Sequence, residues 1–131
     1  MTDFTHLHLH TNFSILDGAS KIDVLMKKVA DSGMNAVAIT DHGNMYGVMH
    51  FTKAAKAHGV KPLIGCEVYV TESSRHNKRG KQDRSGHHLI LIAKNKKGYE
   101  KKMERDVANK AVLDLERKTK STITRMKMKF R

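Results

Sequence analysis

Residues 36–43 read Ala36-Val-Ala-Ile-Thr-Asp-His-Gly43, an uninterrupted apolar run that ends abruptly in polar residues. A short continuous apolar run is typical of a strand buried on both faces, as in a parallel sheet. Apolar residues recur at helical spacing on both sides of it, over residues 22–33 and 45–58. A buried strand between two amphipathic helices indicates an α/β fold.

Three other segments are predicted as strands. Residues 4–9 alternate apolar with polar side chains, whereas residues 62–70 and 88–93 are largely apolar. Helical sequence follows from about Lys96, and the polar stretch at residues 71–87 is expected to be a long loop. The order strand, helix, strand, helix, strand, strand, helix predicts an α/β architecture with largely parallel strands.

The composition narrows the class of protein. The chain has 131 residues, 39% of them hydrophobic, which is one domain by length. No apolar run approaches the roughly 20 residues that a membrane helix needs, so we expect no membrane association. A single cysteine, Cys66, excludes an internal disulfide and makes the cytoplasm the expected location. We expect Cys66 to be a small core residue.

Charge is unevenly distributed along the chain. Lys and Arg number 25 against 13 Asp and Glu, a net charge of +12. Residues 101–131 carry 11 of those basic and 4 of those acidic residues, and they contain no histidine. This basic tail suggests a nucleic acid or another polyanion as partner. The alternative is a solvated, partly disordered end.

His6, His8 and His10 alternate along the first predicted strand, so all three imidazoles can line one face. Neutral imidazole is the commonest transition-metal ligand, and Asp17 follows closely behind them. The alternative is that these are surface histidines. Three in alternation beside a carboxylate favour the metal site. His50, His58 and His76 are instead expected to be structural.

Further polar residues stand at strand ends. Functional residues gather at the carboxyl ends of parallel strands, where Asp41, His42 and Glu67 are expected. His42 can ligate a metal while Asp41 orients a neighbouring ligand, although Asp41 could simply be a turn residue. Glu67 lies in an apolar run, where an ionised carboxylate is costly unless it is paired or bound to a metal. The alternative is that its side chain faces water. One of His87 and His88 should face the same cluster, although these residues open their strand.

The combination of imidazoles and carboxylates predicts a divalent-metal centre. Mixed nitrogen and oxygen ligation suits Zn²⁺, Mn²⁺ or Fe, with Mg²⁺ as a further option, and several close ions suit phosphoester hydrolysis. The chain has no Gly-x-x-x-x-Gly-Lys phosphate loop, no Gly-x-Ser-x-Gly elbow and no Cys-x-x-Cys pair.

Five motifs occur in order over residues 4 to about 100. They closely resemble the polymerase and histidinol phosphatase (PHP) domain that begins bacterial DNA polymerase III alpha subunits. The motifs are His6-Leu-His8-Leu-His10-Thr, Ser14-Ile-Leu-Asp17-Gly18, Ala38-Ile-Thr-Asp41-His42-Gly43-Asn44-Met45, Lys61-Pro-Leu-Ile-Gly65-Cys-Glu67-Val-Tyr69 and His88-Leu-Ile-Leu-Ile-Ala93-Lys94-Asn95.

The resemblance implies a distorted β/α barrel with a metal cluster at its carboxyl-end face. It also implies a metal-dependent phosphoesterase or 3'-5' exonuclease type of site in a replicative polymerase subunit, with DNA and other replisome subunits as partners. We expect Asp41, His42 and Glu67 to be the catalytic residues. The implied metal ligands are His8, His10, Asp17, His42, Glu67 and His88.

The resemblance stops near residue 100, so we expect two regions. Residues 1–100 correspond to the first half of a PHP domain, and residues 101–131 form an unmatched basic tail, helical or disordered. About three further family ligands and the polymerase region would lie outside this chain. Whether the chain alone is an enzyme is therefore open, and we expect little or no nuclease activity from it.

Two other functions are compatible with the residues. One is a stand-alone phosphatase of the histidinol-phosphatase kind, and the other is a non-catalytic module that binds DNA or replisome subunits. The polymerase-type motifs around Glu67 and His88 favour the replicative subunit.

Overall fold

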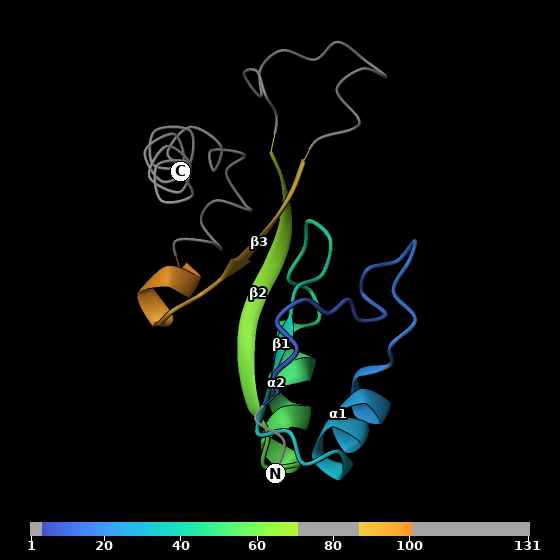
Figure 1. Cartoon of the computed structure of the whole chain (residues 1–131). Coiled ribbons are helices and arrows are strands. Elements are labelled where there is room, and N and C mark those ends of the chain that lie inside the picture. Colours follow the sequence, from blue (N-terminus) through green and yellow to red (C-terminus); the bar gives the residue numbers. More distant parts are fainter. Residues whose placement is uncertain (1–3, 71–86, 101–131) are drawn as a thin grey trace, which may run out of the picture.

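The computed structural model describes residues 4–70 and 87–100 (Figure 1). Its elements follow the order α1 (Ile22–Asp31), β1 (Ala36–Ile39), α2 (Val48–Ala57), β2 (Lys61–Val70) and β3 (His87–Ile92). Residues 96–100 are helical, in agreement with the helical sequence expected from Lys96. The predictions for residues 71–86 and 101–131 lie outside the described residues.

The three strands form one sheet in the order β1-β2-β3. The first half of β2 pairs in parallel with β1, from Ala36 opposite Lys61 to Ile39 opposite Ile64. Its second half pairs with β3 in antiparallel orientation, from Gly65 opposite Ile92 to Val70 opposite His87. The expected parallel pairing is therefore found for β1 and β2, while β3 runs the other way. A parallel partner would require a crossover, and the sequence between β2 and β3 lacks the apolar periodicity of a crossover helix.

The regular strand predicted over residues 4–9 is not formed. This segment runs in extended form beside β1 (Figure 1), and its backbone carbonyls at His6 and Leu9 accept hydrogen bonds from Ala38 N (2.8 Å) and Thr40 N (2.9 Å). The two carbonyls are three positions apart in the chain, whereas the two amides are two positions apart. The alternation that a regular ladder requires is thereby interrupted, so the prediction was right about location and wrong about regularity.

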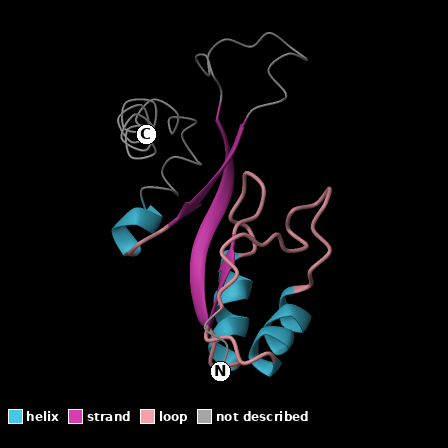
Figure 2. Cartoon of the chain, viewed as in Figure 1, coloured by secondary structure: helices cyan, strands magenta, loops and turns pink. Residues whose placement is uncertain are grey.

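The apolar core lies between the two helices and the sheet. Figure 2 shows α1 and α2 beside the lower half of β2, whereas β3 and the upper half of β2 extend past them. The helical spacing predicts eight inward-facing apolar side chains, of which Leu25 is partly buried and the other seven are buried: Ile22, Met26, Val29, Val48, Phe51, Ala54 and Ala55. Gly33 (φ 74°) and Gly59 (φ 69°) each lie two residues past the end of a helix, in the left-handed region that glycine tolerates. The principal core residues are Ile22, Met26, Val29, Val37, Ile39, Val48, Phe51 and Ala55.

Over residues 4–70 and 87–100, no helix combines the length and apolar character needed to cross a membrane.

Candidate metal centre

The parallel pairing of β1 and β2 continues past the end of β1 and brings two polar positions together. Glu67 N donates to Asp41 O (3.0 Å), and Gly43 N donates to Glu67 O (2.8 Å). These two bonds form an isolated parallel bridge between His42 and Glu67. The backbone therefore holds the segment after β1 against the middle of β2, at the carboxyl end of the parallel pair.

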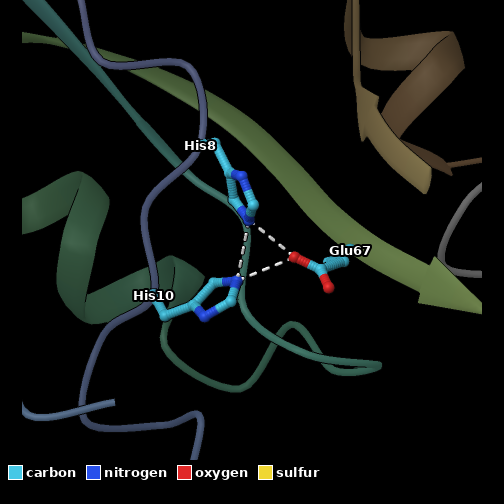
Figure 3. A group of neighbouring side chains, drawn as sticks. All are labelled: His8, His10 and Glu67. Atoms are coloured by element: carbon cyan, nitrogen blue, oxygen red, sulfur yellow. Dashed lines mark hydrogen bonds and ion pairs between the residues drawn. The ribbon is translucent and has the colours of Figure 1, made fainter. Parts of the chain in front are cut away.

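Glu67 lies in the middle of the candidate centre, and only 1% of its surface is exposed. Its Oε2 lies 2.7 Å from His8 Nε2 and 2.8 Å from His10 Nε2 (Figure 3). The other oxygen, Oε1, lies 3.1 Å from His42 Nδ1 and also contacts His88 Nδ1. Four imidazoles from three separate parts of the chain thus converge on one buried carboxylate.

Asp17 joins the cluster from the loop that precedes α1. Its Oδ2 lies 2.7 Å from His42 Nε2 and 3.7 Å from His10 Nδ1. Because His42 presents Nε2 to Asp17 and Nδ1 to Glu67, its ring links the two carboxylates. The side chain of Asp17 is 52% exposed, in contrast to the buried Glu67.

The donor atoms are spaced as ligands of a shared ion would be. Two ligands about 2.1 Å from one ion, at tetrahedral or octahedral angles, lie roughly 3 Å apart. In each of three groups the ligand atoms lie within 4.8 Å of one another, and several pairs are close to that ideal separation. Together the groups contain all six residues predicted as metal ligands. They are His8, His10 and Glu67; His10, Asp17 and His42; and His42, Glu67 and His88.

The surroundings of Glu67 favour its ionised form. Burial by itself disfavours the charge, but the hydrogen bonds with His10 and His8 and the positive charge of His42 outweigh it. The pKa of this carboxyl is therefore held below its ordinary value. A buried carboxylate that stays ionised is the form in which Glu67 can accept a cation.

The antiparallel direction of β3 explains why a residue at the start of a strand joins the centre. His88 is paired with Tyr69, two positions beyond Glu67, so the start of β3 lies beside the carboxyl end of β2. Of the two histidines expected to provide one member of the cluster, His88 makes the contact with Glu67. Strand order along the chain could not reveal this arrangement, since it depends on the direction of pairing.

Some residues singled out from the sequence lie outside these groups. The ring of His6 packs edge-on against Phe4, with centroids 4.7 Å apart, although the alternation predicted it beside His8 and His10. His50 Nε2 lies 3.0 Å from Asp23 Oδ1 and pairs with it between α2 and α1. Cys66 is buried, as expected of a small core residue.

Asp41 faces away from the ligand groups and into the protein. Its Oδ1 accepts hydrogen bonds from Thr11 N (2.6 Å) and Ser14 Oγ (2.8 Å), and its Oδ2 accepts one from Thr11 Oγ1 (2.8 Å). The catalytic role predicted for Asp41 stays a prediction, whereas its bonding to Thr11 and Ser14 is an observed feature that sequence reasoning missed. The only available signal was the position of both hydroxyl residues between His10 and Asp17.

Tyr69 was also missed. Its hydroxyl oxygen lies 3.5 Å from His42 Nδ1, and its ring centroid is 4.9 Å from that of His88. Residues 67 and 69 share one face of a strand, so the period of two could have placed Tyr69 beside Glu67. Tyr69 is 51% exposed and forms part of the rim of the centre.

The fold and the cluster define an α/β metal-centre domain of the PHP type. The PHP domain family matches residues 6–107, and the chain belongs to that family. It is 52% identical over 108 residues to the DNA polymerase III subunit alpha of Aquifex aeolicus, covering 78% of this chain and 9% of that protein. It is 49% identical over 100 residues to the corresponding Helicobacter pylori subunit, covering 76% of this chain and 8% of that protein. The chain thus spans less than a tenth of the length of these relatives.

Solved structures give the same fold. A Bifidobacterium adolescentis protein described as a candidate metal-dependent phosphoesterase superposes with a TM-score of 0.54 and 25% identity, over 68% of this chain and 27% of that one. An amidohydrolase from Chromobacterium violaceum gives a TM-score of 0.53 and 25% identity, with the same coverage. The predicted PHP-type α/β fold, present here in part, is confirmed.

Proposed function

We propose that this chain contributes part of a divalent-metal phosphoesterase centre in the PHP region of a replicative DNA polymerase III alpha subunit. DNA would be its substrate or template partner, other replisome subunits its protein partners, and the cytoplasm its location. The match to the PHP family over residues 6–107 and the 52% identity to an alpha subunit over 108 residues support the replicative setting. The chemistry rests on the cluster around Glu67.

One observation carries the proposal, namely the buried carboxylate of Glu67 among four imidazoles. An ionised carboxylate removed from water needs a compensating charge, and a divalent ion bound jointly by carboxylate and imidazole provides it. The donors suit Zn²⁺, Mn²⁺ or Fe better than Mg²⁺, which prefers oxygen ligands. The residues that would hold the ions are His8, His10, Asp17, His42, Glu67 and His88.

Bound ions of this kind activate a water molecule and stabilise negative charge on phosphoryl oxygens. The side chains of this chain would orient the ions and leave one side open to a phosphoester. His8 and His88 are 59% and 50% exposed, whereas Glu67 is buried beneath them. The exposed imidazoles would be accessible to a strand end, as a 3'-5' exonuclease-type site requires, while Glu67 would be shielded from solvent.

The test is metal binding by the purified 131-residue chain, measured calorimetrically with Mn²⁺ and Zn²⁺. His10→Ala should weaken binding by at least about tenfold, since His10 belongs to two of the three groups. His50→Ala is the matched control, because His50 pairs with Asp23 instead, and it should bind as the wild type does. Equal affinity in His10→Ala and wild type would contradict the proposal.

Hydrolysis is tested separately on single-stranded DNA. We expect little or no cleavage by this chain alone, since residues 101–131 contain no His or Cys to complete the ligand set. Strong metal-dependent cleavage that His8→Ala abolishes would show that the described ligands are sufficient by themselves.

A further inference from the structure

The loop that carries Asp17 is fastened to the interior by three buried polar residues. Thr11 and Asp41 are 0% exposed and Ser14 is 2% exposed. A buried carboxylate is costly unless its oxygens are bonded, and both oxygens of Asp41 accept hydrogen bonds from Thr11 and Ser14. All three bonds come from uncharged donors of the same short loop. A carboxylate placed this way specifies the path of that loop.

Ser14 connects this network to two members of the metal centre. Its hydroxyl oxygen accepts a hydrogen bond from His42 N (3.1 Å) while donating to Asp41. Its carbonyl oxygen accepts from Asp17 N (3.1 Å) and from Gly18 N (2.7 Å). The backbone positions of His42 and Asp17 are therefore both defined relative to one serine.

The backbone of Asp41 also bonds to β2, because its carbonyl oxygen accepts a hydrogen bond from Glu67 N. Its side chain holds the loop and its main chain holds β2. The carboxylate itself has no exposed surface and belongs to none of the ligand groups.

We infer that Thr11, Ser14 and Asp41 form a buried anchor that positions Asp17 and His42 for metal binding, with Asp41 as a positioning residue. The inference rests on the proposed metal centre. Outer partners of metal ligands commonly change metal affinity by about 10- to 100-fold when removed, because the ligands lose their preset geometry.

Four variants test the anchor. Ser14→Ala removes the link to His42, and Asp41→Ala removes the acceptor for the loop. Asp41→Asn keeps the shape, since an amide oxygen can accept from Thr11 N and Ser14 while the amide nitrogen faces Thr11 Oγ1. Thr52→Ala is the matched control, as its hydroxyl donates to Val48 O (2.8 Å) within α2, away from the centre.

The first measurement is amide hydrogen exchange of the metal-free chain at residues 11–18 and 42. Ser14→Ala and Asp41→Ala should accelerate exchange there by at least about tenfold, whereas Asp41→Asn and Thr52→Ala should resemble the wild type. The second measurement is a titration with Co²⁺, in which binding is monitored by the visible absorption of the ion. Affinity should fall about 10- to 100-fold in the two alanine variants of the anchor and only a few-fold in Asp41→Asn.

The anchor is overturned if Ser14→Ala matches Thr52→Ala in both measurements. It is also overturned if Asp41→Asn loses as much Co²⁺ affinity as Asp41→Ala, because the charge of Asp41 and not its bonding would then matter. A wild-type chain that binds no Co²⁺ contradicts the proposed function instead, and the exchange measurement still decides the anchor.

Discussion

The apolar core and two carboxylates, Glu67 in the candidate metal centre and Asp41 beside it, are equally buried but are stabilised by different interactions. Phe51 and Asp41 are both 0% exposed, and Glu67 is 1% exposed. Phe51 is stabilised by apolar neighbours from α1 and β1, whereas the two carboxylates are stabilised only by specific hydrogen bonds and ion pairs. Apolar packing tolerates approximate shape, but a buried charge needs each partner in place.

Two consecutive residues of β2 show the same contrast. Cys66 and Glu67 are both buried, and successive side chains of a strand point to opposite faces. One face of β2 therefore carries a buried thiol here and the other a buried carboxylate. Substitutions in the core should affect folding, whereas substitutions in the centre should affect metal binding.

The largest effect is expected from Phe51→Ala. Removing a fully buried ring from the core should lower the free energy of unfolding by about 3–5 kcal/mol, measured by urea denaturation. Met49→Ala in the same helix is the control, since Met49 is 66% exposed and its loss should change stability little. Similar losses in both variants would mean that α2 does not bury the face that contacts the sheet.

Glu67→Gln is expected to have the next largest effect. The neutral amide keeps the size of the side chain but removes the charge that four imidazoles surround, so metal affinity should fall about a hundredfold, or ~2.7 kcal/mol. Calorimetric titration with Mn²⁺ measures this loss, with Asp23→Asn in α1 as the matched control. Unchanged affinity in Glu67→Gln would contradict the view that the charge of this buried carboxylate is needed for metal binding.

A smaller effect is expected from Gly18→Ala. A Cβ at this position would collide with the carbonyl oxygen of Thr11, so the loop carrying Asp17 must shift, and metal affinity should fall about tenfold. A Cβ at Gly59 would meet no heavy atom within 4 Å, although its φ of +69° makes alanine strained. Gly59→Ala should therefore lower stability by about 1 kcal/mol and leave metal affinity unchanged. Equal metal affinity in the two variants would contradict this reading of the loop.

The smallest effect concerns pH in the metal-free chain. Because the folded state lowers the pKa of Glu67 below its ordinary value of 4.5, ionised Glu67 stabilises the fold above that pH. This contribution is lost as the pH falls through the lowered pKa. Thermal unfolding between about pH 6 and pH 3 should thus show a smaller acid destabilisation in Glu67→Gln than in the wild type. Identical acid profiles would show that the carboxylate adds nothing to stability without a metal.

Local patterns account for the success of the sequence predictions. The helical spacing of Ile22, Met26 and Val29 depends only on neighbouring residues, and these side chains are buried as expected. The sequence likewise predicts β1 from its apolar run, together with the polar residues that follow the strand. Parallel strands place their carboxyl ends at one edge of a sheet, which accounts for the meeting of His42 and Glu67.

Predictions failed where they depended on pairing between distant segments. Alternation over residues 4–9 indicated a regular strand, but the mismatch in spacing against β1 is visible only when both segments are aligned. The role of Ser14 was hidden for the same reason, because a serine in a loop has no distinguishing pattern until Asp41 lies behind it.

The amino-acid sequence by itself determined which residues can bury apolar surface and which can bind a metal, because composition and short-range periodicity follow from covalent order. Only the tertiary structure decided that β3 runs antiparallel to β2 and so brings His88 to Glu67. It also decided that Asp41 turns inward to hold a loop. Both outcomes depend on backbone hydrogen bonds and contacts between segments that are distant in the chain, which no local pattern encodes.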